Sequence, residues 1–234
     1  MRPFKPSYIL EVIPRLLPYL SVTLGIMLCV VALGTLLGFF LARVRIFRPR
    51  IFSPLADAYI GILRCTPPIV LLFMVYYGLP ELVLSLWGIN INGIHNGIFV
   101  LISFTLLFAA PMAELMRSAY LSIDPGQREA AVSVGLSEAQ AFFHIILPQA
   151  TAVALPNFGN ALINLMKDGS LAYTIGLIDI MGQGTLIIAR NFGAYSLEIY
   201  LALTIIYWSM TLVIEHLFGA LEQRFSKGKK RIAA

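Results

Sequence analysis

The sequence predicts an all-α integral membrane protein with about five membrane-spanning helices. Apolar residues make up 59% of its 234 residues and charged residues only 12%, with a mean hydropathy of +0.83. Ordinary soluble domains are about 45–50% apolar and about 25% charged. The charged residues are also unevenly spread, because they gather between long apolar stretches. Composition and pattern together argue against a soluble enzyme, a disordered chain and a nucleic-acid-binding module.

The membrane spans are predicted from stretches with few or no Asp, Glu, Lys or Arg residues. A membrane-crossing helix needs about 20 mainly apolar residues, and the first stretch, residues 16–42, has no charged residue at all. All spans are assigned to a single membrane domain, residues 1–234. In chain order they are residues 18–42, 58–79, 97–119, 150–166 and 197–221.

A further apolar stretch, residues 169–189, is interrupted by Gly176, Asp179, Gly182 and Gly184. Irregular backbone at membrane depth needs protein or water to cover it. We therefore expect a re-entrant piece that lines a cavity, with a short sixth membrane segment as the alternative.

The basic residues predict the orientation of the chain. Eleven of them follow spans one, three and five, whereas four lie on the opposite side of the predicted membrane. An excess of Lys and Arg marks cytoplasmic loops, which puts the N-terminus outside and the C-terminus in the cytoplasm. The net charge of +5 is thus mostly a sidedness signal and not a nucleic-acid-binding patch. The eleven are Arg43, Arg45, Arg48, Arg50, Arg117, Arg128, Arg224, Lys227, Lys229, Lys230 and Arg231.

The cytoplasmic loop of residues 121–149 is too regular to be a simple connector. Asp124 is a typical N-cap and Pro125 suits the first position of a helix, so we expect a helix from here to Gly135. Ser137 is then expected to cap a second short helix. Two such helices either contact a groove of another protein or lie on the bilayer surface.

Within this loop, Glu-Ala-Ala is followed at fixed spacing by a Gly, an Ile and a Leu-Pro pair, at Glu129, Ala130, Ala131, Gly135, Ile145, Leu147 and Pro148. The pattern resembles the EAA loop of permease subunits in bacterial ATP-binding-cassette importers. Arg-Cys-Thr-Pro at residues 64–67, Tyr-Tyr-Gly-Leu-Pro at 76–80 and Lys-Asp-Gly-Ser-Leu at 167–171 resemble the polar amino acid branch of that family.

The resemblance implies a permease subunit of an ATP-driven importer in a bacterial inner membrane. Its partners would be cytoplasmic ATP-binding subunits, a second permease chain (identical or a sister), an external solute-binding protein and an amino acid substrate. In the loop, the Glu would contact the ATP-binding subunit, the two Ala would allow its close approach, and the Gly would permit the turn. The ATPase-coupling residues by this resemblance are Glu129, Ala130, Ala131, Gly135, Leu147 and Pro148.

Lys167, Asp168 and Ser170 form the first candidate for a substrate pathway, because ionisable residues at bilayer depth are costly and mark functional sites. An adjacent base and acid could meet the carboxylate and the ammonium of an amino acid. A structural ion pair is the alternative.

Glu114 and Arg64 are further pathway candidates, each with a simpler interpretation. Glu114 and Arg117 are three residues apart on one helix, so they could pair with each other. Arg64 could extend to the membrane surface along its aliphatic stem.

No motif for catalysis or for a resident cofactor is present. The chain lacks the Gly-Lys-Ser/Thr of a phosphate-binding loop, and its histidines lack metal-ligand spacing. Cys29 and Cys65 are too few for a zinc site. A non-catalytic membrane subunit driven by a separate ATPase is therefore expected. The alternatives are an ion-coupled secondary transporter or channel and a non-transporting scaffold. The amino acid is left open, with cystine or another sulfur amino acid as a candidate.

Gly34 and Gly38 lie four residues apart in span one, a spacing that lets two helices approach closely. Packing against another span of the same chain is the favoured interpretation, with packing against a neighbouring chain as the alternative.

Overall fold

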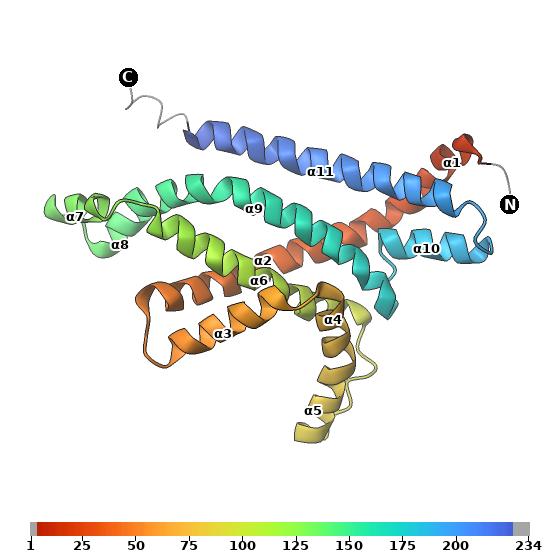
Figure 1. Ribbon diagram of the computed structural model, residues 1–234, viewed down its shortest axis with the longest axis horizontal. Coiled ribbons are helices and arrows are strands. Elements are labelled where there is room, and N and C mark those ends of the chain that lie inside the picture. The colour runs from red at the N-terminus through yellow and green to blue at the C-terminus, as the bar shows by residue number, and fades with distance from the viewer. Residues whose placement is uncertain (1–3, 227–234) are drawn as a thin grey trace.

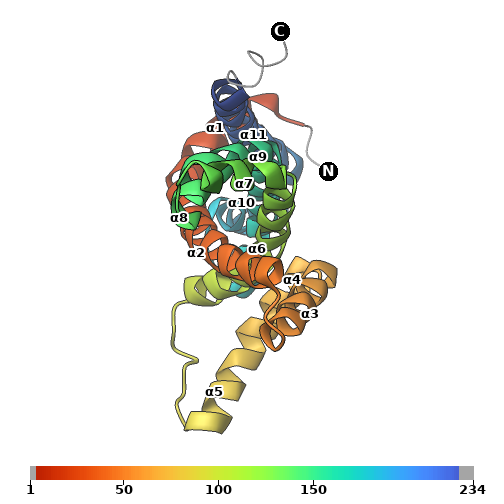
Figure 2. The same ribbon diagram turned by 90° about the vertical axis from the view of Figure 1, so that its left-hand side faces the viewer.

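The structure, a computed structural model, describes residues 4–226, and every regular element in that range is helical (Figure 1). Four long helices, α2 (Leu20–Phe47), α6 (Asn96–Leu121), α9 (Leu147–Gly169) and α11 (Ser196–Ser226), run side by side, with α9 opposite in direction to the other three (Figures 1 and 2). The shorter helices are α1 (Pro6–Leu16), α3 (Phe52–Cys65), α4 (Pro68–Phe73), α5 (Leu79–Trp87), α7 (Pro125–Ser133), α8 (Glu138–Ala141) and α10 (Ile180–Arg190).

Five helical runs are long and apolar enough to cross a membrane, which confirms the predicted all-α membrane class. Predicted spans one, three, four and five each lie inside one of these runs. The runs are Pro6–Phe47, Pro68–Trp87, Asn96–Leu121, Glu138–Ile175 and Ser196–Phe225. The chain is therefore a multi-pass membrane protein.

Helix α6 forms the centre of the bundle, because α2, α3, α4 and α9 all pack against it. Its Phe104 and Met112 are fully buried, together with Val30 of α2 and Leu72 of α4. A second apolar cluster joins α1, α10 and α11. Lipid is as apolar as these side chains, so close packing rather than escape from water holds such helices together.

The Gly34 and Gly38 face of α2 packs against α6, as the favoured interpretation predicted. A Cβ atom built on Gly34 would lie 2.9 Å from Cδ1 of Phe108, and one on Gly38 would lie 2.7 Å from Cβ of Met112. Both distances are too short for a real side chain. The two glycines therefore let the backbones of α2 and α6 approach each other within this chain.

The prediction of span two as one helix over residues 58–79 is wrong. Helix α3 ends at Cys65, Thr66 is extended with ψ of 124°, and α4 begins only at Pro68. The break follows from two consecutive prolines, which lack an N–H donor and disfavour a helical conformation in the preceding residue. Beyond a π-helical turn, α5 projects away from the bundle (Figures 1 and 2).

The second helix of the cytoplasmic loop is not separate from span four, contrary to expectation. Helix α8 is only four residues long and continues through a π-helical turn, Phe142–Ile146, into α9. Pro148, which has no N–H to donate, directly follows the π-helical turn, where the regular α-helical hydrogen-bond pattern is already interrupted. One helical run, Glu138–Ile175, therefore joins the loop directly to the membrane.

The stretch of residues 169–189 contains a short 3₁₀ helix, Ser170–Ile175, and most of α10. With 11 residues at about 1.5 Å each, α10 is about 16 Å long and cannot cross a hydrocarbon layer of about 30 Å. It packs against α1 and α11. Its length excludes a sixth spanning helix.

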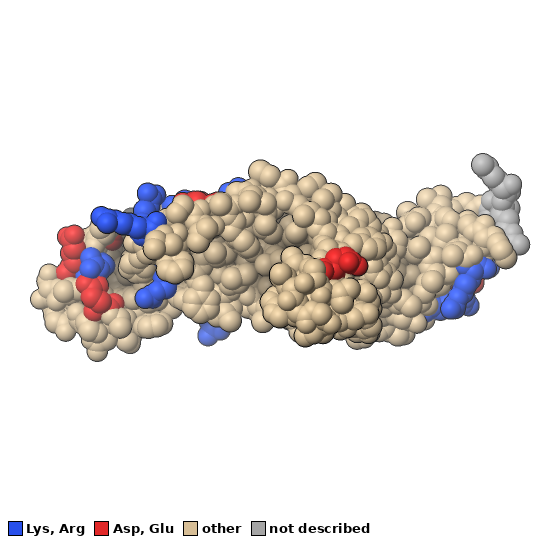
Figure 3. Space-filling model, turned by 90° about the horizontal axis from the view of Figure 1, so that it is seen from below, with Lys and Arg blue, Asp and Glu red and all other residues tan. Residues whose placement is uncertain are grey.

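Charged side chains gather toward the two ends of the molecule, and the long surface between them is mostly uncharged, with one acidic patch near the middle of the view (Figure 3). The end that carries α7 and α8 is also the end toward which α2 and α11 run (Figure 1). Four of the basic residues behind the predicted orientation, Lys227, Lys229, Lys230 and Arg231, lie outside the described residues. The orientation itself stays a prediction.

Candidate functional site

Helix α7 begins as the sequence predicts. Asp124 is its N-cap and accepts a hydrogen bond from the Gly126 N–H at 2.8 Å, and Pro125 occupies the first helical position. The cap satisfies one of the N–H groups that a helix leaves without a partner at its start. The cap therefore stabilises the start of this nine-residue helix.

Gly135 ends α7 with a φ of +95°, a conformation in which a side chain is strained. The Gly135 N–H donates to the Val132 carbonyl at 2.9 Å, and the Leu136 N–H donates to the Ala131 carbonyl at 3.2 Å. This pair of hydrogen bonds is the Schellman motif, in which glycine is the usual residue. The predicted turn at Gly135 is therefore confirmed in its geometry.

Two contacts join α7 to the helix that follows. Ser137 and Gln140 form the predicted capping box, with the Ser137 N–H bound to Oε1 of Gln140 at 2.8 Å. Arg128 binds Glu138 through two hydrogen bonds of 2.8 and 2.5 Å. The Glu138 carboxylate raises the pKa of the Arg128 guanidinium above its usual value. The ion pair links α7 to the start of the run that becomes α9.

The two alanines of the EAA pattern face different ways. Ala131 is buried, with 6% of its surface exposed, and α7 packs on the π-helical turn at Phe142–Ile146. Glu129 and Ala130 are exposed. Only part of the motif is therefore available to another protein, and the rest seats α7 on its own chain. Leu147 and Pro148, also exposed, follow at the start of α9.

A cluster of four charged residues joins α2, α3 and α6. Arg117 binds Oε1 of Glu114 at 2.5 Å, as the three-residue spacing predicts. Arg45 of α2 binds the other oxygen of Glu114, and it also binds Asp57 of α3 at 2.6 Å. The sequence gives no sign of Arg45 and Asp57 in this cluster, because only folding brings the three helices together.

The other pathway candidates are spread out. Lys167 is exposed and Asp168 half-buried near the end of α9, and Ser170 donates to the Lys167 carbonyl at 2.6 Å. Arg64 is exposed at the end of α3. Within residues 4–226, no hydrogen bond or salt bridge joins these residues to one another through their ionised groups, or to Glu114.

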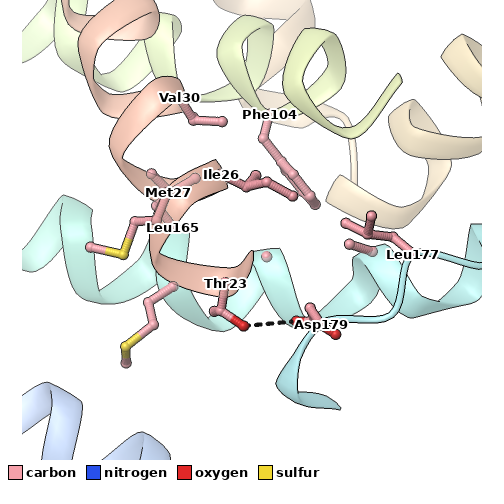
Figure 4. A pocket seen from close by; sticks show the side chains of 11 residues that line it. Thr23, Ile26, Met27, Val30, Phe104, Leu165, Leu177 and Asp179 are labelled. Atoms are coloured by element: carbon pink, nitrogen blue, oxygen red, sulfur yellow. Dashed lines mark hydrogen bonds between the residues drawn. The ribbon is translucent and has the colours of Figure 1, made fainter. Parts of the chain in front are cut away.

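Asp179 carries a buried carboxylate, with 2% of its surface exposed. In the sequence it stands out only as a break in the apolar stretch of residues 169–189. It caps α10 by accepting from the Gly182 N–H at 2.8 Å, and it also accepts from the Thr23 hydroxyl at 3.4 Å (Figure 4). Thr23 accepts in turn from the Ile180 N–H. A cavity of about 20 Å³ adjoins the two side chains, which is room for one water molecule. The sequence signal for this role is the acidic residue Asp179 directly before the first residue of α10, because Asp is a preferred N-cap residue.

Residues 34–227 match the family described as binding-protein-dependent transport system inner membrane component. The chain is 42% identical to the L-cystine transport system permease protein TcyL of Bacillus subtilis (strain 168), over 98% of this chain and 95% of that one. It is 34% identical to the glutamine transport system permease protein GlnP of Escherichia coli (strain K12), over 94% and 97%.

Two solved structures share the architecture. The crystal structure of an amino acid ABC transporter with histidines superposes with a TM-score of 0.79 at 28% identity, covering 95% of this chain and all of that one. An inward-facing form of the MetNI methionine ABC transporter gives a TM-score of 0.67 at 18% identity, over 92% and 97%, and so shares the fold. The chain belongs to the family of binding-protein-dependent transport system inner membrane components.

Proposed function

We propose that the chain is the membrane-spanning permease subunit of an ATP-driven amino acid importer. The observation that carries this proposal is α7, a capped helix that holds Glu129 and Ala130 exposed at one end of the bundle. A surface of this kind, with one small residue and one acid on view, suits close contact with another protein. The names of the relatives TcyL and GlnP give independent support.

The chain itself is proposed to be non-catalytic, and a separate cytoplasmic subunit hydrolyses ATP. Movement of that subunit is passed to the membrane through α7 and the continuous run Glu138–Ile175. The Arg128–Glu138 ion pair stiffens the connection between the two. The proposed coupling residues are Glu129, Ala130, Ala131, Gly135, Leu147 and Pro148.

The proposed substrate is a polar amino acid, and the first candidate is L-cystine. Its support is the 42% identity to a cystine permease over almost the whole chain, against 34% for the glutamine permease. Lys167, Asp168, Ser170 and Arg64 remain the proposed pathway residues, whereas the contacts of Glu114 with Arg45 and Arg117 favour a structural role for Glu114.

The proposed assembly contains a second permease chain, two ATP-binding subunits and an external solute-binding protein. It lies in a bacterial inner membrane, with the N-terminus outside and the C-terminus in the cytoplasm. The whole of residues 1–234 forms one permease domain in this assembly. The competing proposals are an ion-coupled transporter or channel, which has no use for the exposed EAA surface, and a scaffold that binds an ATPase without moving a solute.

The test is purification of the tagged chain from membranes in mild detergent, followed by reconstitution with the proteins that accompany it. We expect an ATP-binding subunit to copurify and to drive uptake of radiolabelled L-cystine. Glu129→Lys should abolish copurification, whereas Gln127→Lys, a charge added elsewhere on α7, should not. Recovery of the chain alone, with uptake driven by a proton gradient, would instead establish the ion-coupled alternative. ATPase binding without uptake of any amino acid would establish the scaffold.

A further inference from the structure

A second, larger cavity lies at the opposite end of α6 from α7, beside the projecting helix α5 (Figure 1). It has a volume of about 260 Å³ and is bounded by the π-helical turn Met74–Gly78, the start of α5, residues 88–95 and the start of α6. The side chains that line it are Tyr76, Tyr77, Pro80, Glu81, Asn92 and Phe99.

One wall of this cavity is aromatic and packs against the buried core of the bundle. The Tyr76 ring packs edge-on against Phe99, with centroids 5.4 Å apart, and edge-on against Tyr77 at 5.0 Å. Phe99 is buried in the core with 2% of its surface exposed. The core therefore fixes the position of Tyr76, while Tyr77 stays 65% exposed at the rim.

Glu81 supplies the only formal charge in this part of the chain. No other Asp, Glu, Lys or Arg occurs between Arg64 and Glu114. Glu81 is exposed, and among residues 4–226 no salt bridge or side-chain hydrogen bond occupies its carboxylate. Its place in the first turn of α5 suits the helix dipole. The dipole does not explain why the same side chain lines a cavity with aromatic walls.

We propose that this cavity is an outer binding site for a single zwitterionic amino acid. The Glu81 carboxylate accepts hydrogen bonds from the ammonium group, and the Tyr76 and Tyr77 rings lie beside the same charge. The side-chain amide of Asn92 donates to the carboxylate of the ligand. The inference rests on the proposed function, because it assumes that this end receives the substrate.

The chemistry of the lining favours this ligand over others. A carboxylate beside aromatic rings attracts an ammonium group through a charge-assisted hydrogen bond and cation–π contacts. An anion without an ammonium group would be repelled by Glu81. A metal ion is disfavoured because no group of three His, Cys, Asp or Glu residues gathers within the described part of the chain. Pockets for drug-sized ligands have volumes of about 300–1,000 Å³. A cavity of about 260 Å³ therefore suits one amino acid rather than a peptide.

The test measures equilibrium binding to the permease–ATPase complex in lipid nanodiscs, without the external binding protein. The probes are L-cystine and the standard amino acids, together with cystamine, which lacks the carboxylates, and 3,3′-dithiodipropionate, which lacks the ammonium groups. We expect L-cystine to bind, cystamine to bind more weakly and dithiodipropionate not to bind. Glu81→Gln should raise the Kd for L-cystine by about tenfold or more, and Glu81→Asp should recover part of the loss.

Asn92→Ala tests recognition of the ligand carboxylate separately from recognition of its ammonium group. It should raise the Kd for L-cystine and leave that for cystamine unchanged, because cystamine has no carboxylate for the amide to hold. Glu11→Gln and Tyr200→Leu, which change exposed residues outside the cavity, are the matched controls and should bind as the wild type does. Size-exclusion profiles of all the variants establish that each is folded.

Binding and transport together distinguish the two proposals. An unchanged Kd in Glu81→Gln, or no binding of any probe to the wild-type complex, overturns the outer site even if the complete transporter takes up amino acids. Failure of the complete transporter to take up any amino acid overturns the proposed function, whatever the nanodisc measurement gives. In uptake assays, Glu81→Gln should raise the KM and leave the maximal rate within about twofold, which a folding defect would not do.

Discussion

Gly38 on α2 and Met112 on α6 approach so closely that a Cβ atom on Gly38 would lie 2.7 Å from the Cβ of Met112. The same atom would lie 3.1 Å from the carbonyl oxygen of Ala109. Backbone as well as side chain thus blocks any larger residue. This contact lies within the most extensive helix pairing of the bundle, α2 with α6.

Replacing Gly38 should therefore destabilise the bundle. We expect Gly38→Leu to cost about 1–3 kcal/mol, the usual range for overpacking a filled interior. The measurement is the thermal midpoint of the purified chain in detergent. Gly25→Leu on the same helix is the control, because nothing lies within 4 Å of a Cβ added there. Equal midpoints for the two variants would contradict the close α2–α6 contact.

Gly135→Asp should leave the protein in the membrane and uncouple ATP hydrolysis from uptake. A side chain fits the open space but not the φ of +95°, so the turn that ends α7 must shift. Gly193→Asp imposes comparable strain at a φ of +79°, also in open space, in the loop before α11. Uptake per ATP should fall only in the first variant. A similar fall in both would mean that α7 has no special part in coupling.

Glu114→Gln should lower stability without changing substrate affinity, because the carboxylate is engaged by Arg45 and Arg117. Hydrogen bonds to charged groups contribute about 1.5–3 kcal/mol, and we expect a loss of that order. Glu11→Gln, which removes the exposed pair with Lys5, should cost about 0–1 kcal/mol. Thermal midpoints compare the two. A changed KM with an unchanged midpoint would return Glu114 to the substrate pathway.

Asp179→Ala should destabilise α10 by about 1–2 kcal/mol, because the Gly182 N–H loses its cap in a buried setting. Asp179→Asn keeps a side-chain oxygen at that position and should lose much less. Hydrogen exchange of residues 180–184 is the direct measurement. Equal protection in the Ala and Asn variants would show that the carboxylate does not hold the start of the helix.

Lys167→Met and Asp168→Asn test the proposed substrate pathway. If both residues meet the charged groups of an amino acid, each variant should raise the KM for uptake by about tenfold. The double variant should then raise it further, at an unchanged rate of ATP hydrolysis. Arg190→Met, which removes an exposed basic residue from the end of α10, is the control. Unaltered affinity in both single variants would remove the pair from the pathway.

The local features of the cytoplasmic loop were predictable because the chain encodes them over short distances. The Asp124 cap, the Ser137 capping box and the turn at Gly135 each depend on residues within about four positions of one another. The pairing of Glu114 with Arg117 was predictable for the same reason. Hydropathy likewise located four of the five spans, because a helix in lipid must satisfy its backbone internally.

Composition and spacing by themselves determined the membrane class, the EAA pattern and the caps of α7. Tertiary structure alone decided that α5 leaves the bundle, that Arg45 and Asp57 join Glu114, and that Thr23 meets Asp179 across 156 positions of the chain. It also brought Glu81 and Asn92 to one cavity. The physical reason is range: caps and hydropathy act between sequence neighbours, whereas these contacts depend on how whole helices pack.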